Sequence, residues 1–314
     1  MKNSVAIVGA GISGLTCGVL LAERRVSTTI FADQIGQQTT SAAAAAIWFP
    51  YDAEPAAKVV PWALETYRVL VDLTHEPCSG VSLIELRQYS HTGDLRIPDW
   101  ARSLSAQPVV TGLPPGFTSG YSIIVPLMET TIYLDYLANR FRKAGGEICG
   151  PVHFDKLEDV DPGFDVVINC AGIGARELAD DFDLEPHRGQ VVVVPQILSL
   201  SFALASDTPP LMYAIPRSND CVFGGTNDVS DDRTVDPAAT KRILAECTRV
   251  LNLPQQKVLA ERVGLRPFRK SGVRLELNRL TDGRNVLHNY GHGGAGFTLS
   301  WGCAQEGVAL LHGT

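Results

Sequence analysis

The stretch SVAIVGAGISG at residues 4–14 decides how the chain begins to fold. Its first five residues are mostly apolar, and a glycine turn separates them from LTCGVLLAE at 15–23, which has the composition of a helix. A second β-branched run, TTIF at 28–31, ends just before Asp33. This order of strand, glycine turn, helix, strand and acid predicts a parallel βαβ unit.

Each part of this unit suits a dinucleotide. Gly9 permits the tight turn, Gly11 lets the backbone approach a pyrophosphate, and Gly14 allows close packing of helix and strand. The helix N-terminus offers N–H groups and a positive dipole end to the phosphates, and the acid can accept hydrogen bonds from a ribose. The dinucleotide is expected at Gly9, Ala10, Gly11, Ile12, Ser13, Gly14 and Asp33.

The rest of the chain lacks the regular β-α units of a contiguous nicotinamide-binding domain. Helices are expected at about 54–74, 130–144 and 237–251, and strands at 82–89, 121–125 and 165–170. From 188 to 268, β-branched runs broken by glycine and proline predict a mainly antiparallel sheet. The fold class is therefore α/β, with a Rossmann-like nucleotide domain interleaved with a second, α+β domain that binds the substrate.

Composition excludes several functions. The net charge is −7 and no basic run is longer than two residues, which argues against a nucleic-acid partner. The seven cysteines are scattered without a C-x-x-C pair, which favours reduced thiols in the cytoplasm over disulfides or zinc. His288 and His292 flank a glycine turn without a partnering acid, so no metal is expected. No apolar stretch reaches the ~18 residues of a membrane span.

A second glycine motif, VLHNYGHGGAGFT, occupies residues 286–298. Only 18 residues follow Gly296, too few for another βαβ unit, so a separate nicotinamide site is not expected. Backbone donors and a helix N-terminus suit the pyrimidine end of a flavin, which becomes negative on reduction. The alternative is a glycine-rich loop that serves close packing alone.

Taken together, the motifs resemble the FAD-dependent D-amino acid oxidase family, in that family's order and from residue 4 to about 305. The block His288–Gly294 is the family's specific signature, whereas the block Gly9–Gly14 occurs in many flavoproteins. The blocks that carry the resemblance are Gly9–Gly14 with Asp33, Thr39-Thr40 through Trp48-x-Pro50-Tyr51, Arg188-Gly189-Gln190, Tyr213-x-Ile215-Pro216, Gly224-Gly225-Thr226, Gly264-x-Arg266-Pro267, Val273-Arg274-Leu275-Glu276 and His288–Gly294.

The resemblance implies an FAD-binding domain at 1–50, 130–186 and 281–314, and a substrate-binding domain at 51–129 and 187–280. Thr39 and Thr40 would contact FAD, although they could instead cap the alanine-rich helix that follows. The further FAD contacts that it implies are Ala45, Trp48, Gly172, Gly293, Gly294, Ala295, Gly296, Phe297 and Thr298.

The implied reaction converts a D-amino acid and O2 to a 2-oxo acid, ammonia and hydrogen peroxide, by direct hydride transfer to flavin N5. Arg274 and Tyr213 would bind the substrate carboxylate, and the Gly294 carbonyl would bind the amine; these three are the expected catalytic residues. Alternatively, Arg274 forms an ion pair with Glu276 and Tyr213 is a core aromatic. Arg266 is interpreted as a structural charge, as is the nearby Arg269.

Two departures from the family concern specificity. Phe49 replaces a polar glutamine of mammalian members, and Asn227 stands where aspartate-selective members carry an arginine, so neutral or apolar D-amino acids are the expected substrates. The segment 206–212 is short where mammalian relatives carry an active-site lid. A glycine or sarcosine oxidase, a quinone-linked D-amino acid dehydrogenase and a flavin-binding regulatory protein remain as alternatives. The oligomeric state is left open, a homodimer included.

Overall fold

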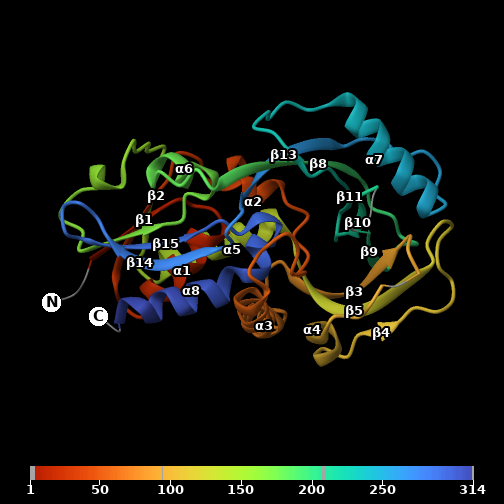
Figure 1. Cartoon of the computed structure of the whole chain (residues 1–314), viewed down its shortest axis with the longest axis horizontal. Coiled ribbons are helices and arrows are strands. Elements are labelled where there is room, and N and C mark those ends of the chain that lie inside the picture. The colour runs from red at the N-terminus through yellow and green to blue at the C-terminus, as the bar shows by residue number, and fades with distance from the viewer. Residues whose placement is uncertain (1–3, 94, 207–209, 313–314) are drawn as a thin grey trace.

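A computed structural model of the chain describes residues 4–93, 95–206 and 210–312, and Figure 1 shows its two sheets side by side. The first sheet has the strand order β14-β15-β7-β1-β2-β6, parallel except at the β14–β15 hairpin. Its strands are β1 (Ser4–Val8), β2 (Ser27–Phe31), β6 (Glu147–Cys149), β7 (Val166–Asn169), β14 (Arg274–Arg279) and β15 (Asn285–Tyr290).

The predicted βαβ unit is confirmed, because helix α1 (Ile12–Glu23) connects the parallel neighbours β1 and β2. Helix α1 packs against α5 (Thr130–Lys143) and α8 (Gly296–His312) on one face of the sheet. This double cover explains why α1 is apolar nearly all round, with nine of its twelve residues buried.

The second sheet has the order β12-β8-β11-β10-β9-β3-β5-β4, with β13 on β8, and every pair except β3–β9 is antiparallel. The mainly antiparallel sheet is thus confirmed. Its strands are β3 (Val81–Ser90), β4 (Gln107–Pro108), β5 (Ser119–Met128), β8 (Leu184–Pro195), β9 (Phe202–Ser206), β10 (Met212–Pro216), β11 (Asp220–Gly224), β12 (Asp228–Val229) and β13 (Ala260–Arg269).

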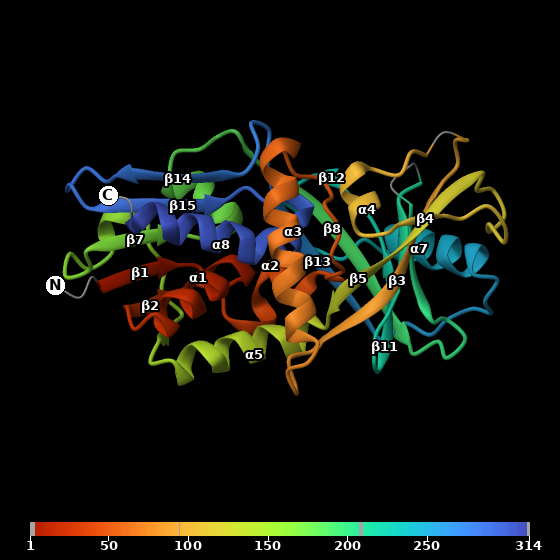
Figure 2. The ribbon, with the colours of Figure 1, turned by 90° about the horizontal axis from the view of Figure 1, so that it is seen from below.

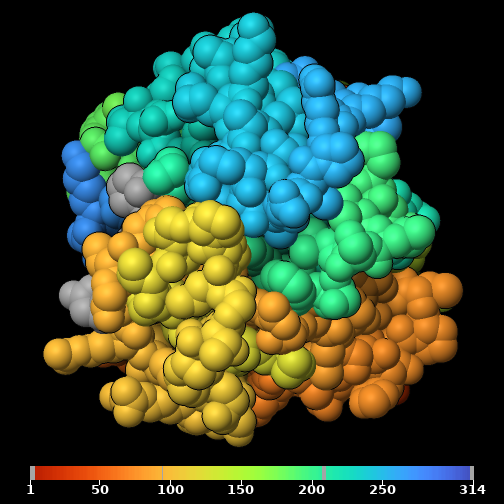
Figure 3. All heavy atoms as spheres, turned by 90° about the vertical axis from the view of Figure 1, so that its right-hand side faces the viewer, coloured from red at the N-terminus to blue at the C-terminus, as the bar shows by residue number. Residues whose placement is uncertain are grey.

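Two long helices position this sheet. Helix α7 (Pro237–Val250) packs on β8, β10 and β11, and its N-terminus is capped by the Asp236 carboxylate, which accepts the Ala238 N–H. Figure 3 looks onto this end of the molecule, where α7 and the chain around β4 form the surface. Helix α3 (Ala56–Leu73) crosses between the two sheets and packs against α8, β3 and β5 (Figure 2).

The chain leaves the first sheet for the second twice and returns twice, but at boundaries that differ from those expected. Strand β8 begins at Leu184, before the predicted limit at 187, and β14 belongs to the first sheet although 274–279 was assigned to the substrate domain. The reason is the hairpin: β14 pairs residue by residue with β15, from Arg274 opposite Tyr290 to Arg279 opposite Asn285. The division into two domains itself stays a prediction.

The structure addresses some of the remaining expectations, which concern the cysteines, membrane spans and the lid region. All seven cysteines are unpaired thiols. Within the described residues, no helix combines the length and the apolar character that crossing a membrane requires. The expected lid region runs between β9 and β10, but its residues 207–209 lie outside the described part of the chain. The cytoplasmic location and the oligomeric state stay predictions.

Candidate active site

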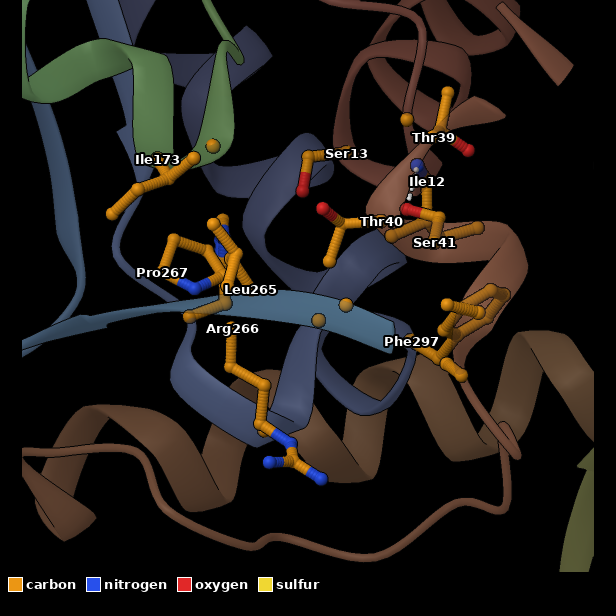
Figure 4. A pocket seen from close by; sticks show the side chains of 18 of the residues that line it. Ile12, Ser13, Thr39, Thr40, Ser41, Ile173, Leu265, Arg266, Pro267 and Phe297 are labelled. Carbon is orange, nitrogen blue, oxygen red and sulfur yellow. Dashed lines mark hydrogen bonds between the residues drawn. The ribbon is translucent and has the colours of Figure 1, made fainter. Parts of the chain in front are cut away.

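A cavity of about 700 Å³ lies between the two sheets and is lined by both. One end is formed by the turn after β1 and the end of β2, and the other by the inner face of the second sheet. Figure 4 shows part of it, where Ser13 and Thr40 approach one another near β13. Most of the predicted FAD contacts line it: Gly9, Ala10, Gly11, Ile12, Ser13, Asp33, Thr39, Thr40, Ala45, Gly172, Gly293, Gly294, Gly296, Phe297 and Thr298.

The first glycine turn leaves no room for side chains at Gly9 and Gly14. A Cβ on Gly9, whose φ is +111°, would lie 2.4 Å from the Cys170 carbonyl oxygen, and a Cβ on Gly14 would lie 1.9 Å from the Gly9 carbonyl oxygen. Gly11 precedes α1 and provides no side-chain cap. The cavity therefore meets bare backbone and a positive helix end, which fits the pyrophosphate of a dinucleotide.

Ser41 was missed by the sequence analysis, although it directly follows the two predicted threonines. Its hydroxyl oxygen accepts the Ile12 N–H at 3.0 Å and so ties α2 (Thr40–Ala43) to the start of α1 (Figure 4). The Thr39 hydroxyl oxygen accepts from the Ala42 N–H and donates to the Gly36 carbonyl. Thr39 thus caps α2, as the alternative interpretation held, and it also lines the cavity together with its neighbour Thr40.

Three predicted contacts do not line the cavity: Gly14, Trp48 and Ala295. The Trp48 ring is completely buried, packs edge-on against Tyr67 and Trp100, and donates its indole N–H to the Ala63 carbonyl at 2.9 Å. Its neighbours Ile47 and Phe49 line the cavity instead. Trp48 is therefore a core residue whose role is to position the segment on either side of it.

The second glycine turn packs against the segment 49–52. A Cβ on Gly293, whose φ is +52°, would lie 1.9 Å from the Asp52 carbonyl oxygen. A Cβ on Gly294 would lie 2.7 Å from the Tyr51 ring. The Thr298 hydroxyl group bonds both the N–H and the carbonyl of Phe49 at 3.0 Å. The start of α8 is thereby held against this wall of the cavity.

His292 lines the cavity beside this turn and is almost completely buried. Burial lowers its pKa to about 4, so the imidazole is neutral at pH 7. Its Nε2 atom lies 3.0 Å from the Asn289 side-chain oxygen. Because a neutral ring adds no charge, the backbone groups and the helix end determine the electrostatics at this end of the cavity.

Arg266 places a cation in the cavity near the second glycine turn, because it lies two residues before Phe268, which pairs with His292. Its side chain leaves β13 on the side opposite to Leu265 and Pro267 (Figure 4), and its Nη1 donates to the Thr226 carbonyl at 2.9 Å and the Asn227 side-chain oxygen at 3.1 Å. No carboxylate of the described residues lies within 4 Å of it as an ion-pair partner. A half-buried arginine with only neutral partners attracts an anion.

Tyr213 stands beside this cation. Its ring packs over the backbone of Gly224 and Gly225, where either glycine's Cβ would collide with the ring. Burial raises the pKa of Tyr213 and the charge of Arg266 lowers it, with a net rise. The phenol is therefore protonated at neutral pH and can donate a hydrogen bond toward the same anion.

Arg274 lies elsewhere, in contrast to its predicted role. It does not line the cavity; its guanidinium donates to the Tyr290 hydroxyl oxygen at 2.6 Å and to Glu276 at 2.6 Å, and lies 3.4 Å from Asp181. Arg269 bonds the same Asp181 at 2.8 Å. Because β14 is the edge strand of the first sheet, Arg274 joins an ion-pair cluster, as the alternative held, and Arg266 takes the position beside Tyr213.

Comparisons with known proteins agree with this architecture. The family model described as FAD dependent oxidoreductase matches residues 4–310. A D-amino-acid oxidase from Rubrobacter xylanophilus is 41% identical over 97% of this chain and 94% of its own length. A D-aspartate oxidase from Homo sapiens is 31% identical over 98% and 94%. A glycine oxidase structure from Bacillus cereus superposes with a TM-score of 0.82 at 19% identity, covering 99% of this chain and 95% of that chain, which shows a common fold.

Proposed function

The chain belongs to the FAD-dependent oxidoreductase family, and from this premise we propose that it oxidises neutral D-amino acids, with O2 as the electron acceptor. The observation that carries this proposal is Arg266, a half-buried cation without a carboxylate partner among the described residues, beside the Tyr213 phenol. The second glycine turn lines the same cavity. An α-amino acid needs a site for its carboxylate, which Arg266 and Tyr213 offer, and an acceptor for its amine, which the Gly294 carbonyl of the glycine turn offers.

The residues present fit FAD. The bare backbone of Gly9 and Gly11 would hold the pyrophosphate, and Asp33, exposed at the end of β2, would bind the adenosine ribose. Residues 293–298 would hold the flavin at the start of α8. When bound, the flavin supplies the acceptor for the hydride of the substrate Cα.

The chain's own residues bind and orient the substrate. Arg266 and Tyr213 donate hydrogen bonds to the carboxylate, and the Gly294 carbonyl oxygen accepts from the amine. With the carboxylate and the amine fixed, only one stereoisomer would turn its α-hydrogen toward the flavin, and the flavin face is thus the third point that selection between isomers requires. No acid or base at the Cα is required for direct hydride transfer, and positioning supplies the rate enhancement.

The neutral side-chain preference follows from what surrounds Arg266. Asn227 supplies an amide there, and its oxygen is already used by the guanidinium. Its nitrogen lies 3.5 Å from the Asp52 carboxylate. A substrate side-chain carboxylate beside Asn227 would meet the negative charge of Asp52, and position 227 would supply no second cation to bind it. Phe49 adds an apolar surface to the cavity.

The proposal predicts that D-alanine, D-valine and D-phenylalanine, but not their L-isomers, reduce the flavin when mixed anaerobically with the purified protein. In air, hydrogen peroxide should form without added dye, and kcat/KM for D-aspartate should be lower than for D-alanine. Flavin absorbance and a peroxide assay measure these results. Reduction by L-isomers alone would overturn the proposal. Turnover that needs a quinone, or that is fastest with glycine, would favour the corresponding alternative enzyme.

Gly189 offers a test of the arginine's position. A Cβ on Gly189 would lie 2.5 Å from both terminal nitrogens of Arg266, which end a flexible side chain and can move aside by giving up the bonds to Thr226 and Asn227. Gly189→Ala is therefore expected to leave the thermal midpoint almost unchanged but to lower kcat/KM for D-alanine by about 10- to 100-fold, because the cation is displaced by roughly 1 Å. Gly93→Ala, where the Cβ meets open space, is the control. Equal activity of both variants would contradict the assignment.

A further inference from the structure

The side chain of Gln88 presents an unsatisfied amide to the cavity. Gln88 lies on β3, lines the cavity and is only 1% exposed. Neither its amide nitrogen nor its amide oxygen has a hydrogen-bond partner among the described residues. Burial of an unpaired primary amide is unfavourable, so a native protein that keeps one calls for a binding partner there.

The alternation of β3 sets the direction of this side chain. Leu86 and Gln88 lie on the cavity face of the strand, whereas Tyr89 packs on the opposite face, in the apolar cluster that includes Ile243 and Val250 of α7. The amide is therefore not a misplaced surface group. It belongs to the inner wall of the second sheet.

Strand register places Gln88 in one row with the substrate-orienting tyrosine. Gln88 pairs with Ala205 on β9, and Ala205 pairs with Tyr213 on β10. Paired residues of neighbouring strands point to the same face, and the strands lie about 4.8 Å apart. The Cα atoms of Gln88 and Tyr213 are thus separated by roughly 10 Å, with the small Ala205 side chain between them.

This row relates the amide to the proposed substrate. A carboxylate bound by Tyr213 and Arg266 would leave the rest of the amino acid beside the wall that carries Ala205 and Gln88. The neighbouring Leu86 and Ile215 also line the cavity and are apolar. Gln88 is therefore the residue of this row that can bind a polar substrate side chain by hydrogen bonds.

We propose that Gln88 is a specificity-determining residue that selects D-amino acids with a neutral amide or hydroxyl side chain. Its amide has two N–H donors and a carbonyl acceptor, which complement an amide such as that of D-asparagine. This inference rests on the proposed function and narrows its substrate class. An amide satisfied by an ordered water alone is the competing explanation.

Isosteric substrate pairs test the inference. D-asparagine and D-leucine have nearly the same shape, as do D-threonine and D-valine, and they differ in hydrogen-bonding capacity. In the wild-type protein, kcat/KM should be higher for the polar member of each pair. In Gln88→Met the ratio of polar to apolar member should fall by about tenfold or more, while kcat/KM for D-leucine is maintained. Gln88→Leu should shift the ratio in the same direction.

Stability and a control variant complete the test. Removing an unpaired buried amide should not lower the thermal midpoint of the substrate-free protein, and Gln255→Met, at an exposed position, should leave both ratios unchanged. If the ratio of kcat/KM for the polar and apolar substrates is the same in wild type and in Gln88→Met, the inference is overturned. The Gln88 amide would then be hydrogen-bonded by water alone. If no D-amino acid reduces the wild-type flavin, the proposed function fails instead, so the two failures are distinguishable.

Discussion

Replacing Arg266 with methionine is expected to lower kcat/KM for D-alanine by about 100- to 1000-fold, the loss typical of removing one partner of a buried, hydrogen-bonded charge pair. The guanidinium has only neutral partners in the described residues, Thr226 and Asn227, so its charge is available to a substrate carboxylate. Methionine keeps the length of the stem and removes the charge. Steady-state kinetics over a D-alanine series, together with the flavin content of each preparation, measure the effect.

Arg274→Met is the matched variant, because it removes the same charge from the residue that the sequence favoured. Its guanidinium is already paired with Glu276 and lies near Asp181. We expect kcat/KM within a few-fold of wild type and a lower thermal midpoint, since Asp181 then keeps only Arg269 as a cationic partner. A large kinetic loss in Arg274→Met with little loss in Arg266→Met would reverse the assignment.

Local patterns predicted much of the fold. The βαβ unit, α3, α5 and α7, and the strands around 82–89 and 121–125 were found within a few residues, because periodicity and glycine turns are local signals. The position of β14 was not predicted. Whether residues 274–279 join one sheet or the other depends on pairing with β15, a tertiary contact that no local pattern contains.

The site shows the same limit. Arg266 and Arg274 lie eight residues apart, and the sequence does not reveal that β13 belongs to the second sheet and β14 to the first. Trp48 was assigned to the cofactor because of its motif, but its ring packs into the core. Gln88 was missed because a glutamine on an amphipathic strand resembles a surface residue. Only the register with Ala205 and Tyr213 places it on the cavity wall.

Gly14→Ala is expected to destabilise the protein by more than about 3 kcal/mol, or to prevent its folding. The added Cβ would lie 1.9 Å from the Gly9 carbonyl oxygen and 3.5 Å from the Cys170 side chain. The first contact is with backbone at the end of β1, which no rotamer change relieves. Helix α1 would have to move away from the sheet, and its packing against α5 and α8 would be lost with it. Urea unfolding at pH 7 and the flavin-to-protein ratio measure the change.

Two other glycines separate packing from cofactor binding. In Gly93→Ala the Cβ meets open space, so the unfolding midpoint should match wild type within error. In Gly11→Ala the Cβ would meet only the Ser41 hydroxyl oxygen, at 3.0 Å, while facing the cavity. This variant should fold but retain less flavin. If Gly14→Ala instead folds with wild-type stability and loses flavin, then Gly14 serves the phosphate itself and not the contact between helix and strand. That result would contradict the packing role. A Cβ that lies 1.9 Å from the Gly9 carbonyl oxygen forces the backbone to shift, and this shift should lower the stability of the protein.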